Sequence, residues 1–306
     1  MLRIENLSKT YGNGVQALKG VSLEIPRGMF GLLGPNGAGK STLMRTIATL
    51  QGVDAGSLFF DNPSTGSGQA LDVLNQQHEV RKILGYLPQD MGIYPGTSAE
   101  TLLDHFAVLK GLDAAGERRE VVEGLLRMTN LYDVRKRKLG SFSGGMRRRF
   151  GIAQALLGDP ELIIVDEPTA GLDPEERIRF HNLLCEIGES AVVILSTHIV
   201  EDVRELCSRM AILSQGRVLL HGEPSALVAR VEGRVWRKVV GRSEVALYQE
   251  SMPVLSTRLA AGRTAIHVLC DQSPGDGFEP AEPDLEHVYF ATLHGGQYPV
   301  TLDNPL

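Results

Sequence analysis

Short apolar runs alternate with segments of helical periodicity along about the first 220 residues of the chain. The clearest runs predict buried strands and lie at residues 30–33, 162–165, 191–195 and 210–213. Apolar positions at helical spacing fill the intervals between them, most clearly at residues 174–188 and 200–207. Strands that alternate with helices predict a parallel α/β sheet that is covered on both faces.

The middle of the chain has a different pattern, because residues 90–158 show helical spacing without a clear strand. Helices are predicted at residues 98–110, 116–129 and 144–157. This region is interpreted as a helical insertion into the α/β core. Just upstream of it, a cluster of turn-forming residues at 62–68 predicts an exposed loop.

The pattern changes again after about residue 222. Six of the 15 prolines follow residue 250, so long regular elements are not expected there. Strands are predicted at residues 235–240 and 264–270, and a loop rich in Pro, Gly and acids at residues 273–283. Residues 223–306 are therefore interpreted as a small α+β appendage, with the last dozen residues loose.

Composition narrows the class of protein. The 306 residues carry a formal net charge of −6, with 42% hydrophobic and 22% charged residues. These values are typical of folded soluble domains and exclude collagen-like and disordered chains. The net acidity gives no reason to expect a nucleic-acid partner. The three cysteines form no close pair, which favours a reducing compartment.

No stretch of the sequence predicts a membrane span. The longest apolar run, at residues 191–195, has five residues, whereas a spanning helix needs about 20. The first residues contain no apolar signal segment and predict the first strand of a fold.

A phosphate-binding loop is predicted directly after the strand at residues 30–33. Gly34-Pro-Asn-Gly-Ala-Gly39-Lys40-Ser41 matches the pattern G-x-x-x-x-G-K-[ST] and precedes a helical pattern. Its glycines allow backbone N–H groups to surround phosphate oxygens, at the positive end of a helix dipole. The expected nucleotide-binding residues here are Gly34, Asn36, Gly37, Ala38, Gly39, Lys40, Ser41 and Thr42.

Two acids close the buried strand at residues 162–165. Asp166 is expected to hold Mg²⁺, and Glu167 to act as general base on the attacking water. An isolated Asp-Glu pair would be interpreted as a solvated turn. The phosphate loop upstream favours the catalytic interpretation, because phosphoryl transfer needs a carboxylate beside Mg²⁺ and a triphosphate.

Ser143, Gly144 and Gly145 open the third helix of the insertion. Ser143 is a good N-cap, and the two glycines permit close approach to an anion. By itself this segment fits a simple capped helix as well as an anion site, and both interpretations stay open at this point.

Taken together, these motifs resemble the nucleotide-binding subunit of ABC transporters across residues 1–222. They occur in that family's order and spacing, although Phe142 and Met146 replace the usual Leu and Gln around the Ser-Gly-Gly signature. The resemblance implies an α/β P-loop NTPase core (1–222) with an antiparallel N-terminal β part and a helical subdomain at about 90–158. The small C-terminal α+β appendage at 223–306 would follow it.

Further site residues are implied by the resemblance. Tyr11 would stack on adenine, and Gln89 would sense Mg²⁺ or the attacking water. His198 would contact the γ-phosphate, and Asp173 ends a loop at 170–173 that would link the two sites of a dimer. The implied cofactors are ATP and Mg²⁺. The catalytic set is Glu167, His198 and Gln89, the metal set is Ser41, Gln89 and Asp166, and Ser143, Gly144, Gly145 and Asp173 join the nucleotide-binding set.

The resemblance also implies partners. Each motif occurs once, so a homodimer, or a heterodimer with a related ATPase, would complete the sites. ATP-driven closure would power a separate integral membrane permease, docked on the insertion after Gln89. The chain would then be a peripheral subunit on the cytoplasmic face of the cell membrane.

A finer resemblance points to the ATPases of type-two exporters, which move drugs, lipids or polysaccharides. It is carried by residues 87–95, 144–149 and 283–289. An importer ATPase is the second interpretation, and a soluble ABC ATPase of translation or DNA maintenance is the third. The arginines Arg147, Arg148 and Arg149 fit a solvated or membrane-proximal helix face as well as a specific partner contact.

Overall fold

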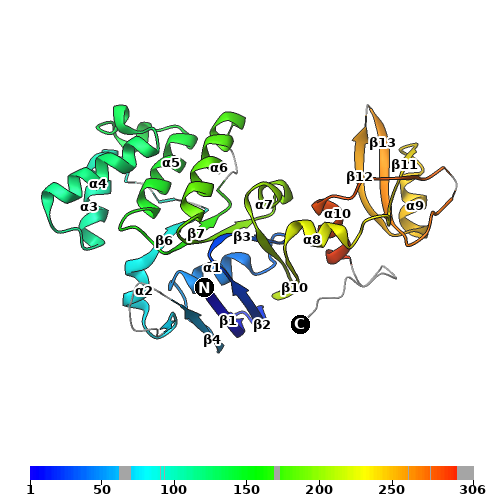
Figure 1. Ribbon diagram of the computed structural model, residues 1–306, viewed down its shortest axis with the longest axis horizontal. Coiled ribbons are helices and arrows are strands. Elements are labelled where there is room, and N and C mark those ends of the chain that lie inside the picture. The colour runs from blue at the N-terminus through cyan, green and yellow to red at the C-terminus, as the bar shows by residue number, and fades with distance from the viewer. Residues whose placement is uncertain are drawn as a thin grey trace.

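The computed structural model describes residues 1–61, 70–89, 91–92, 94–168, 173–260, 262–275 and 277–294. Three sheets organise these residues, and Figure 1 shows the helices α3, α4 and α5 at one end of the molecule and the strands β11–β13 at the other. The predicted loop at 62–68, residues 170–172, Asp90, Ile93 and the last dozen residues lie outside the described ranges.

A six-stranded sheet carries the core, in the order β10-β9-β3-β8-β7-β6. Its neighbours pair in parallel except β9 and β10, which are antiparallel. The predicted apolar runs form four of its strands, so those predictions are confirmed. The bounds are β3 Gly28–Leu33, β6 Leu84–Leu87, β7 Leu162–Asp166, β8 Val192–Thr197, β9 Arg209–Ser214 and β10 Arg217–Gly222.

Both faces of this sheet are buried, as the apolar runs predicted. Leu162 and Ile164 of β7 pack in one cluster with α1 and the N-terminal sheet, whereas Ile163 and Val165 pack on the opposite face with α6 and α7. This alternation is the period-two consequence of strand geometry. The covering helices are α1 Lys40–Ile47, α6 Pro174–Gly188 and α7 Val200–Leu206.

The N-terminal β part is antiparallel, in agreement with the expected fold. Its sheet has the order β2-β1-β4-β5. A short helix, α2, leads from it to β6 of the central sheet. The bounds are β1 Leu2–Thr10, β2 Gln16–Ile25, β4 Ala55–Phe60, β5 Leu71–Asp72 and α2 Gln77–Ile83.

Residues between β6 and β7 form a helical bundle with its own core. The helices are α3 Ala99–Leu109, α4 Ala115–Met128 and α5 Gly144–Ala155, each within about two residues of its prediction. Leu103, Leu126 and Phe150 are fully or almost fully buried in this core. In the described part of 90–158, the β pairing consists of one isolated bridge between Ser98 and Lys138.

A third sheet follows β10, with the order β12-β13-β11-β14. The two predicted strands are confirmed as β11 and β13. The predicted loop at 273–283 was partly wrong, because it contains the two-residue strand β14. The bounds are α8 Pro224–Ala229, β11 Val235–Val240, α9 Val245–Ser251, β12 Val254–Ala260, β13 Arg263–Leu269, β14 Glu279–Pro280 and α10 Leu285–Leu293.

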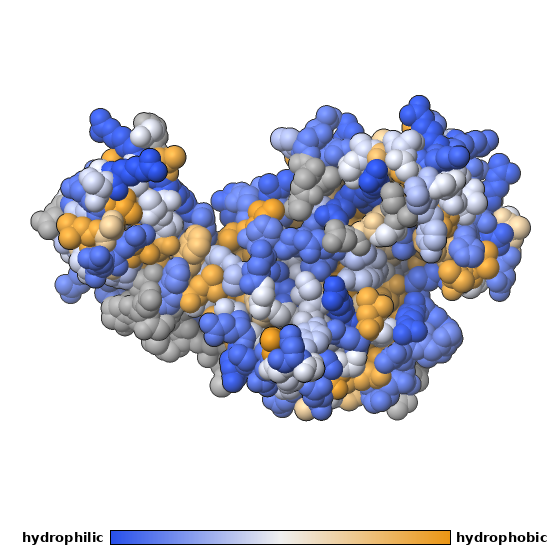
Figure 2. All heavy atoms as spheres, turned by 180° about the vertical axis from the view of Figure 1, so that it is seen from behind, coloured by the Kyte–Doolittle hydropathy of each residue, from blue (hydrophilic) through white to orange (hydrophobic). Residues whose placement is uncertain are grey.

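Helix α10 joins this sheet to the core of the six-stranded sheet. Asp284 caps the helix, since its carboxylate accepts a hydrogen bond from the His287 amide at 2.9 Å. Leu285 and Val288 are buried in the same cluster as Val203 of α7. Seen from behind in Figure 2, the β11–β13 part stands out as a separate lobe at the left of the molecule.

A buried histidine lies between α10 and the third sheet. The His267 ring is 7% exposed, and its centroid lies 4.9 Å from that of His287. Burial, the His287 ring and the Arg258 guanidinium lower the pKa of His267 from 6.5 to about 4. His267 is therefore neutral in the folded chain near neutral pH.

The three cysteines are free thiols in different environments. Cys185 on α6 is exposed, Cys207 is buried and Cys270 is half-buried. Among the described residues, no helix combines the length and the apolar character that crossing a bilayer requires.

Candidate functional site

The expected site residues follow the carboxyl ends of four neighbouring strands. Gln89 lies just beyond β6, Glu167 follows β7, His198 follows β8, and the phosphate loop follows β3. The pairing order β3-β8-β7-β6 places these segments side by side along one edge of the sheet. Ligands of open α/β sheets bind at this edge.

The phosphate loop has a backbone that only glycine accommodates at two positions. Gly39 has φ +106°, and a Cβ atom there would lie 2.5 Å from the Ala17 carbonyl oxygen. At Gly34 a Cβ atom would lie 2.3 Å from the carbonyl oxygen of Leu213. The chain can therefore pass close to β9 before it enters α1 at Lys40, and the N-terminus of a helix is a favourable place for an anion.

Lys40 is held against this loop. Its side chain is buried, and its Nζ donates to the carbonyl oxygens of Gly34 at 2.6 Å and Pro35 at 3.3 Å. Burial lowers the pKa of Lys40, although the carboxylates of Glu167 and Asp166 act in the opposite direction. A desolvated ammonium group that lacks a full counter-charge suits an anionic ligand such as a phosphate.

A cavity of about 610 Å³ opens over the loop. The Tyr11 hydroxyl lies at its margin, 3.1 Å from Thr42 Oγ1 and 3.2 Å from Gln51 Oε1. The structure thus brings together most of the predicted nucleotide-binding residues. The predicted residues that line the cavity are Tyr11, Asn36, Gly37, Ala38, Gly39, Lys40, Ser41, Thr42, Gln89 and Glu167.

The Glu167 carboxylate has a polar partner on each oxygen. Gln89 Nε2 donates to Oε2 at 3.2 Å, and His198 Nδ1 lies 3.0 Å from Oε1. Glu167 also has φ +48°, which is uncommon for a residue with a side chain and is typical of functional sites. Its amide donates to the Ser196 carbonyl oxygen at 2.8 Å, which ties this unusual turn to β8.

Three of the predicted site residues, Ser41, Gln89 and Asp166, carry oxygen atoms of the kinds that bind Mg²⁺. Burial and the nearby Glu167 carboxylate raise the pKa of Asp166, and the charge of Lys40 opposes this rise. Ser41, which opens α1 beside Lys40, offers a hydroxyl oxygen and lines the same cavity. Gln89 uses its amide nitrogen on Glu167, so its oxygen is left for another ligand. Hydroxyl, carboxylate and amide oxygens fit the preference of Mg²⁺.

Ser143 caps α5, as predicted, but lies apart from this cavity. Its hydroxyl accepts a hydrogen bond from the Met146 amide at 3.2 Å. Ser143, Gly144 and Gly145 are not among the residues that line the phosphate-loop cavity. Asp173 acts as a cap too, since its Oδ1 accepts from the Glu176 amide at 2.8 Å at the start of α6. Within one chain these predicted contacts with nucleotide are not assembled.

The arginines after Ser143 make contacts within their own chain that neither interpretation offered by the sequence included, and Arg147 is exposed. Each donates to main-chain carbonyl oxygens of its own chain. Arg147 contacts those of Phe142 at 3.1 Å and Gly140 at 3.4 Å. Arg148 reaches three others, which belong to Gln89, Glu167 and Pro168. No sequence pattern signals these contacts, because a carbonyl acceptor is present at every residue.

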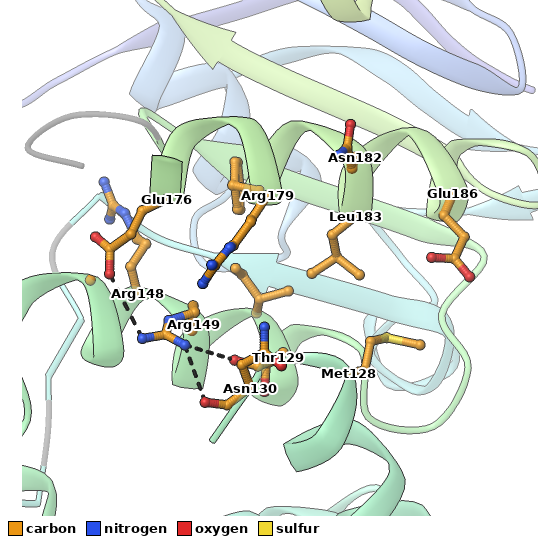
Figure 3. Close-up of a pocket in the computed structure, with 13 residues that line it drawn as sticks. Met128, Thr129, Asn130, Arg148, Arg149, Glu176, Arg179, Asn182, Leu183 and Glu186 are labelled. Atoms are coloured by element: carbon orange, nitrogen blue, oxygen red, sulfur yellow. Dashed lines mark hydrogen bonds and ion pairs between the residues drawn. The ribbon is translucent and has the colours of Figure 1, made fainter. Parts of the chain in front are cut away.

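Arg149 belongs to a second cleft, of about 520 Å³, between α5 and α6. Figure 3 shows its guanidinium bridging Glu176 on α6 and the carbonyl oxygens of Thr129 and Asn130. The Arg149–Glu176 nitrogen–oxygen distance is 3.7 Å. This ion pair connects the helical bundle to the helix that begins at Asp173.

Several known proteins are similar to this chain in sequence and in fold. A family model described as "ABC transporter" matches residues 18–170. The chain is 35% identical over 235 residues to the linearmycin resistance ATP-binding protein of Bacillus subtilis (strain 168), an alignment that covers 76% of this chain and 72% of that protein. It is 30% identical over 290 residues to the Nod factor export ATP-binding protein I of Paraburkholderia xenovorans, covering 94% and 92%.

A third similar protein carries the opposite direction of transport in its name. The methionine import ATP-binding protein of Bordetella pertussis is 35% identical over 286 residues, which cover 90% of this chain and 75% of that protein. Among solved structures, a dimeric post-hydrolysis state of an ATP-binding cassette bound to ADP and Pi matches with a TM-score of 0.65 at 26% identity. That match covers 73% of this chain and 98% of the cassette.

Proposed function

This chain belongs to the ABC transporter family of ATP-binding proteins, and we propose that it is the subunit that powers an exporter. It is an ATPase and the ATP-binding subunit of an ABC transporter. The proposal extends this to a dimer of ATPase subunits whose closure on ATP drives a separate integral membrane permease.

One observation carries the proposal: the Glu167 carboxylate lies between Gln89 and His198 at the edge of the phosphate-loop cavity. A carboxylate fixed at both oxygens is preorganised to accept a proton from an attacking water. His198 would contact the γ-phosphate and Gln89 the water or metal. Hydrolysis would then act on the end of the nucleotide farthest from Tyr11, which would stack on adenine.

The remaining residues bind and orient the nucleotide. Lys40 would neutralise the β- and γ-phosphates, and the amides from Gly34 to Thr42 would surround them. Ser41, Asp166 and Gln89 would hold Mg²⁺, which supplies neutralisation of phosphate charge when bound. The raised pKa of Asp166 and the lowered pKa of Lys40 both favour a site that is completed by ligand charges.

The position of Ser143 supports a second ATPase subunit. Ser143, Gly144 and Gly145 form a helix N-terminus away from their own phosphate loop. In a dimer they would close over the γ-phosphate bound by the partner, and Asp173 would lie near the junction of the two sites. The dimeric cassette bound to ADP and Pi supports this arrangement.

Export is favoured by the Nod factor relative, which aligns with 94% of this chain. The finer resemblance to exporter ATPases, at residues 87–95, 144–149 and 283–289, agrees with it. The permease would dock on the helical bundle after Gln89, which places the chain on the cytoplasmic face of the cell membrane. The methionine import relative favours a second candidate, an importer subunit.

Reconstitution tests partner and direction together. The full chain is purified with the membrane protein that copurifies with it, and the complex is placed in vesicles with ATP outside only. Export predicts ATP-dependent accumulation of substrate inside vesicles whose ATPase subunits face outward, and Glu167→Gln should abolish it. Substrate leaving preloaded vesicles of the same orientation would support import. An active ATPase that copurifies with no membrane protein would contradict the proposal.

A further inference from the structure

Arg148 on α5 connects two catalytic loops through their backbones. Its Nε donates to the Pro168 carbonyl oxygen at 2.8 Å, and its Nη1 donates to that of Gln89 at 2.9 Å. Its Nη2 donates to the carbonyl oxygen of Glu167. One side chain thus contacts the segment after β6 and the segment after β7, both of which carry residues of the proposed catalytic set.

Only a guanidinium has the donors that this arrangement needs. It presents N–H groups in a rigid planar fork, so three carbonyl oxygens can be held in fixed relative positions. Hydrogen bonds from a charged donor are stronger than those between neutral groups. The contact falls on Glu167 itself, whose φ of +48° persists only where the surroundings determine it.

The position of Arg148 near the start of α5 links the Glu167 backbone to any movement of this helix. Helix α5 begins at Gly144, directly after the Ser143 cap, and Arg148 follows about one helical turn later. The N-terminus of this helix is the part that would meet the ATP of a partner subunit. A shift of α5 on meeting that ATP would move the Arg148 guanidinium and, with it, the Glu167 backbone of the same subunit.

We propose that Arg148 is a positioning residue for hydrolysis, which aligns Glu167 and Gln89 according to the position of α5. This inference rests on the proposed function, because it assigns a regulatory contact to the same ATP site. Arg148 is not among the residues that line the phosphate-loop cavity. Arg148 acts through Glu167 of its own subunit. Because Arg148 and Ser143 lie on the same helix end, ATP bound by the partner subunit and contacted by Ser143 would influence the position of this Glu167.

The neighbouring arginines provide matched controls. In Figure 3 Arg149 is engaged with Glu176 and the carbonyl oxygens of Thr129 and Asn130, on the side of the α5–α6 cleft. Arg147 donates to Phe142 and Gly140, within the segment that leads into α5. Arg147→Gln removes the same charge from the same helix without touching the contacts to Gln89 or Glu167.

The test compares Arg148→Gln, Arg148→Lys and Arg147→Gln in the full chain. Steady-state kcat, the equilibrium Kd for ATP and the thermal midpoint are measured for each. Loss of alignment predicts a fall in kcat of about 10- to 100-fold for Arg148→Gln. The Kd should stay within about twofold of the parent, because Arg148 does not line the phosphate-loop cavity. Arg148→Lys should be intermediate, since one ammonium cannot span three acceptors. Arg147→Gln should match the parent.

A double variant separates positioning from folding. In a Glu167→Gln background, Arg148→Gln should cause no further loss of hydrolysis, since both changes act on one group. ATP-dependent dimerisation of that background should persist. An Arg148→Gln variant with parental kcat would overturn the inference, as would a fall in ATP affinity and thermal midpoint that matches the fall in kcat in both Arg148 variants. A parent chain without ATPase activity would instead contradict the proposed function.

Discussion

His198 Nδ1 lies 3.0 Å from Oε1 of Glu167, across the ends of the adjacent strands β8 and β7. The other carboxylate oxygen accepts the Gln89 amide at 3.2 Å. Both partners belong to the chain itself, so the fold orients the carboxylate that we propose as general base. An isosteric substitution of Glu167 can therefore remove its ability to accept a proton while its side chain stays in place.

Glu167→Gln should retain ATP binding and lose hydrolysis. The amide keeps the shape and one acceptor oxygen but cannot take a proton from water, and we expect kcat to fall by about 100-fold or more. ATP should then trap a dimer that elutes earlier on gel filtration. Glu189→Gln, at an exposed position, should behave as the parent. A Glu167→Gln chain that stays monomeric with ATP and Mg²⁺ would contradict the dimer.

Lys40→Ala should abolish ATP turnover. The variant removes the buried ammonium that faces the phosphate loop, and we expect ATP affinity to fall by about 10-fold or more. Binding of a fluorescent ATP analogue and release of phosphate measure the two effects. Lys82→Ala provides the control, because Lys82 is exposed and pairs with Glu79 on the surface. Parental turnover in Lys40→Ala would show that the site is assigned wrongly.

Gly39→Ala should destabilise the chain and impair ATP binding together. Its Cβ would lie 2.5 Å from the Ala17 carbonyl oxygen, at a φ that disfavours any side chain. We expect a loss of about 1–3 kcal/mol of unfolding free energy. Gly52→Ala is the matched control, since nothing lies within 4 Å of the added atom. Equal denaturant midpoints for the two variants would contradict the close approach of Gly39 to the Ala17 carbonyl oxygen.

Lowering the pH from about 7 to 5 should destabilise the C-terminal sheet, because His267 is protonated more readily in the unfolded chain. Its pKa is about 4 in the folded chain and 6.5 when unfolded. Between these values the unfolded chain binds a proton that the folded chain does not, so the free energy of unfolding falls as pH decreases. The loss should reach about 2 kcal/mol at pH 5 and vanish above about pH 7.

Trp236 allows this local effect to be measured. It is the chain's one tryptophan and lies in β11, so its fluorescence reports unfolding of this sheet. Urea midpoints at pH 7.5 and pH 5 should differ less in His267→Gln than in the parent. His105→Gln, in the exposed part of α3, should keep the parental difference. The same pH dependence in both variants would exclude His267 as its source.

The central sheet and its helices could be predicted because periodicity reports burial directly. Residues 162–165 are apolar at every position, and in β7 they are buried on both faces. The phosphate loop could be predicted equally well, since backbone geometry requires glycine at its special positions. In both cases the physical constraint falls on residue types that lie close together in the sequence.

Helix α10 and the Arg148 contacts were not predicted, for two different reasons. The α10 residues follow Pro280 and Pro283, which suggested irregular structure, but Asp284 starts the helix with a capping box. Its apolar side chains are then buried against α7, a contact that is distant in sequence. Arg148 donates hydrogen bonds to main-chain carbonyl oxygens, and these acceptors are the same whatever the residue type, so the sequence does not indicate them. Gln89 and His198 were expected only from the family resemblance, because their position beside Glu167 depends on which strands are neighbours in the sheet.

The unequal accessibility of the three thiols gives the chain a built-in attachment point for spectroscopic labels. Burial raises the pKa of the Cys207 thiol, and burial together with Asp271 raises that of Cys270, so both react slowly with maleimides at neutral pH. Cys185 is exposed on α6, the helix that Asp173 caps. Brief labelling would therefore place a fluorophore or spin label on that helix in an otherwise unaltered chain, and two labelled copies would report their separation during each catalytic cycle.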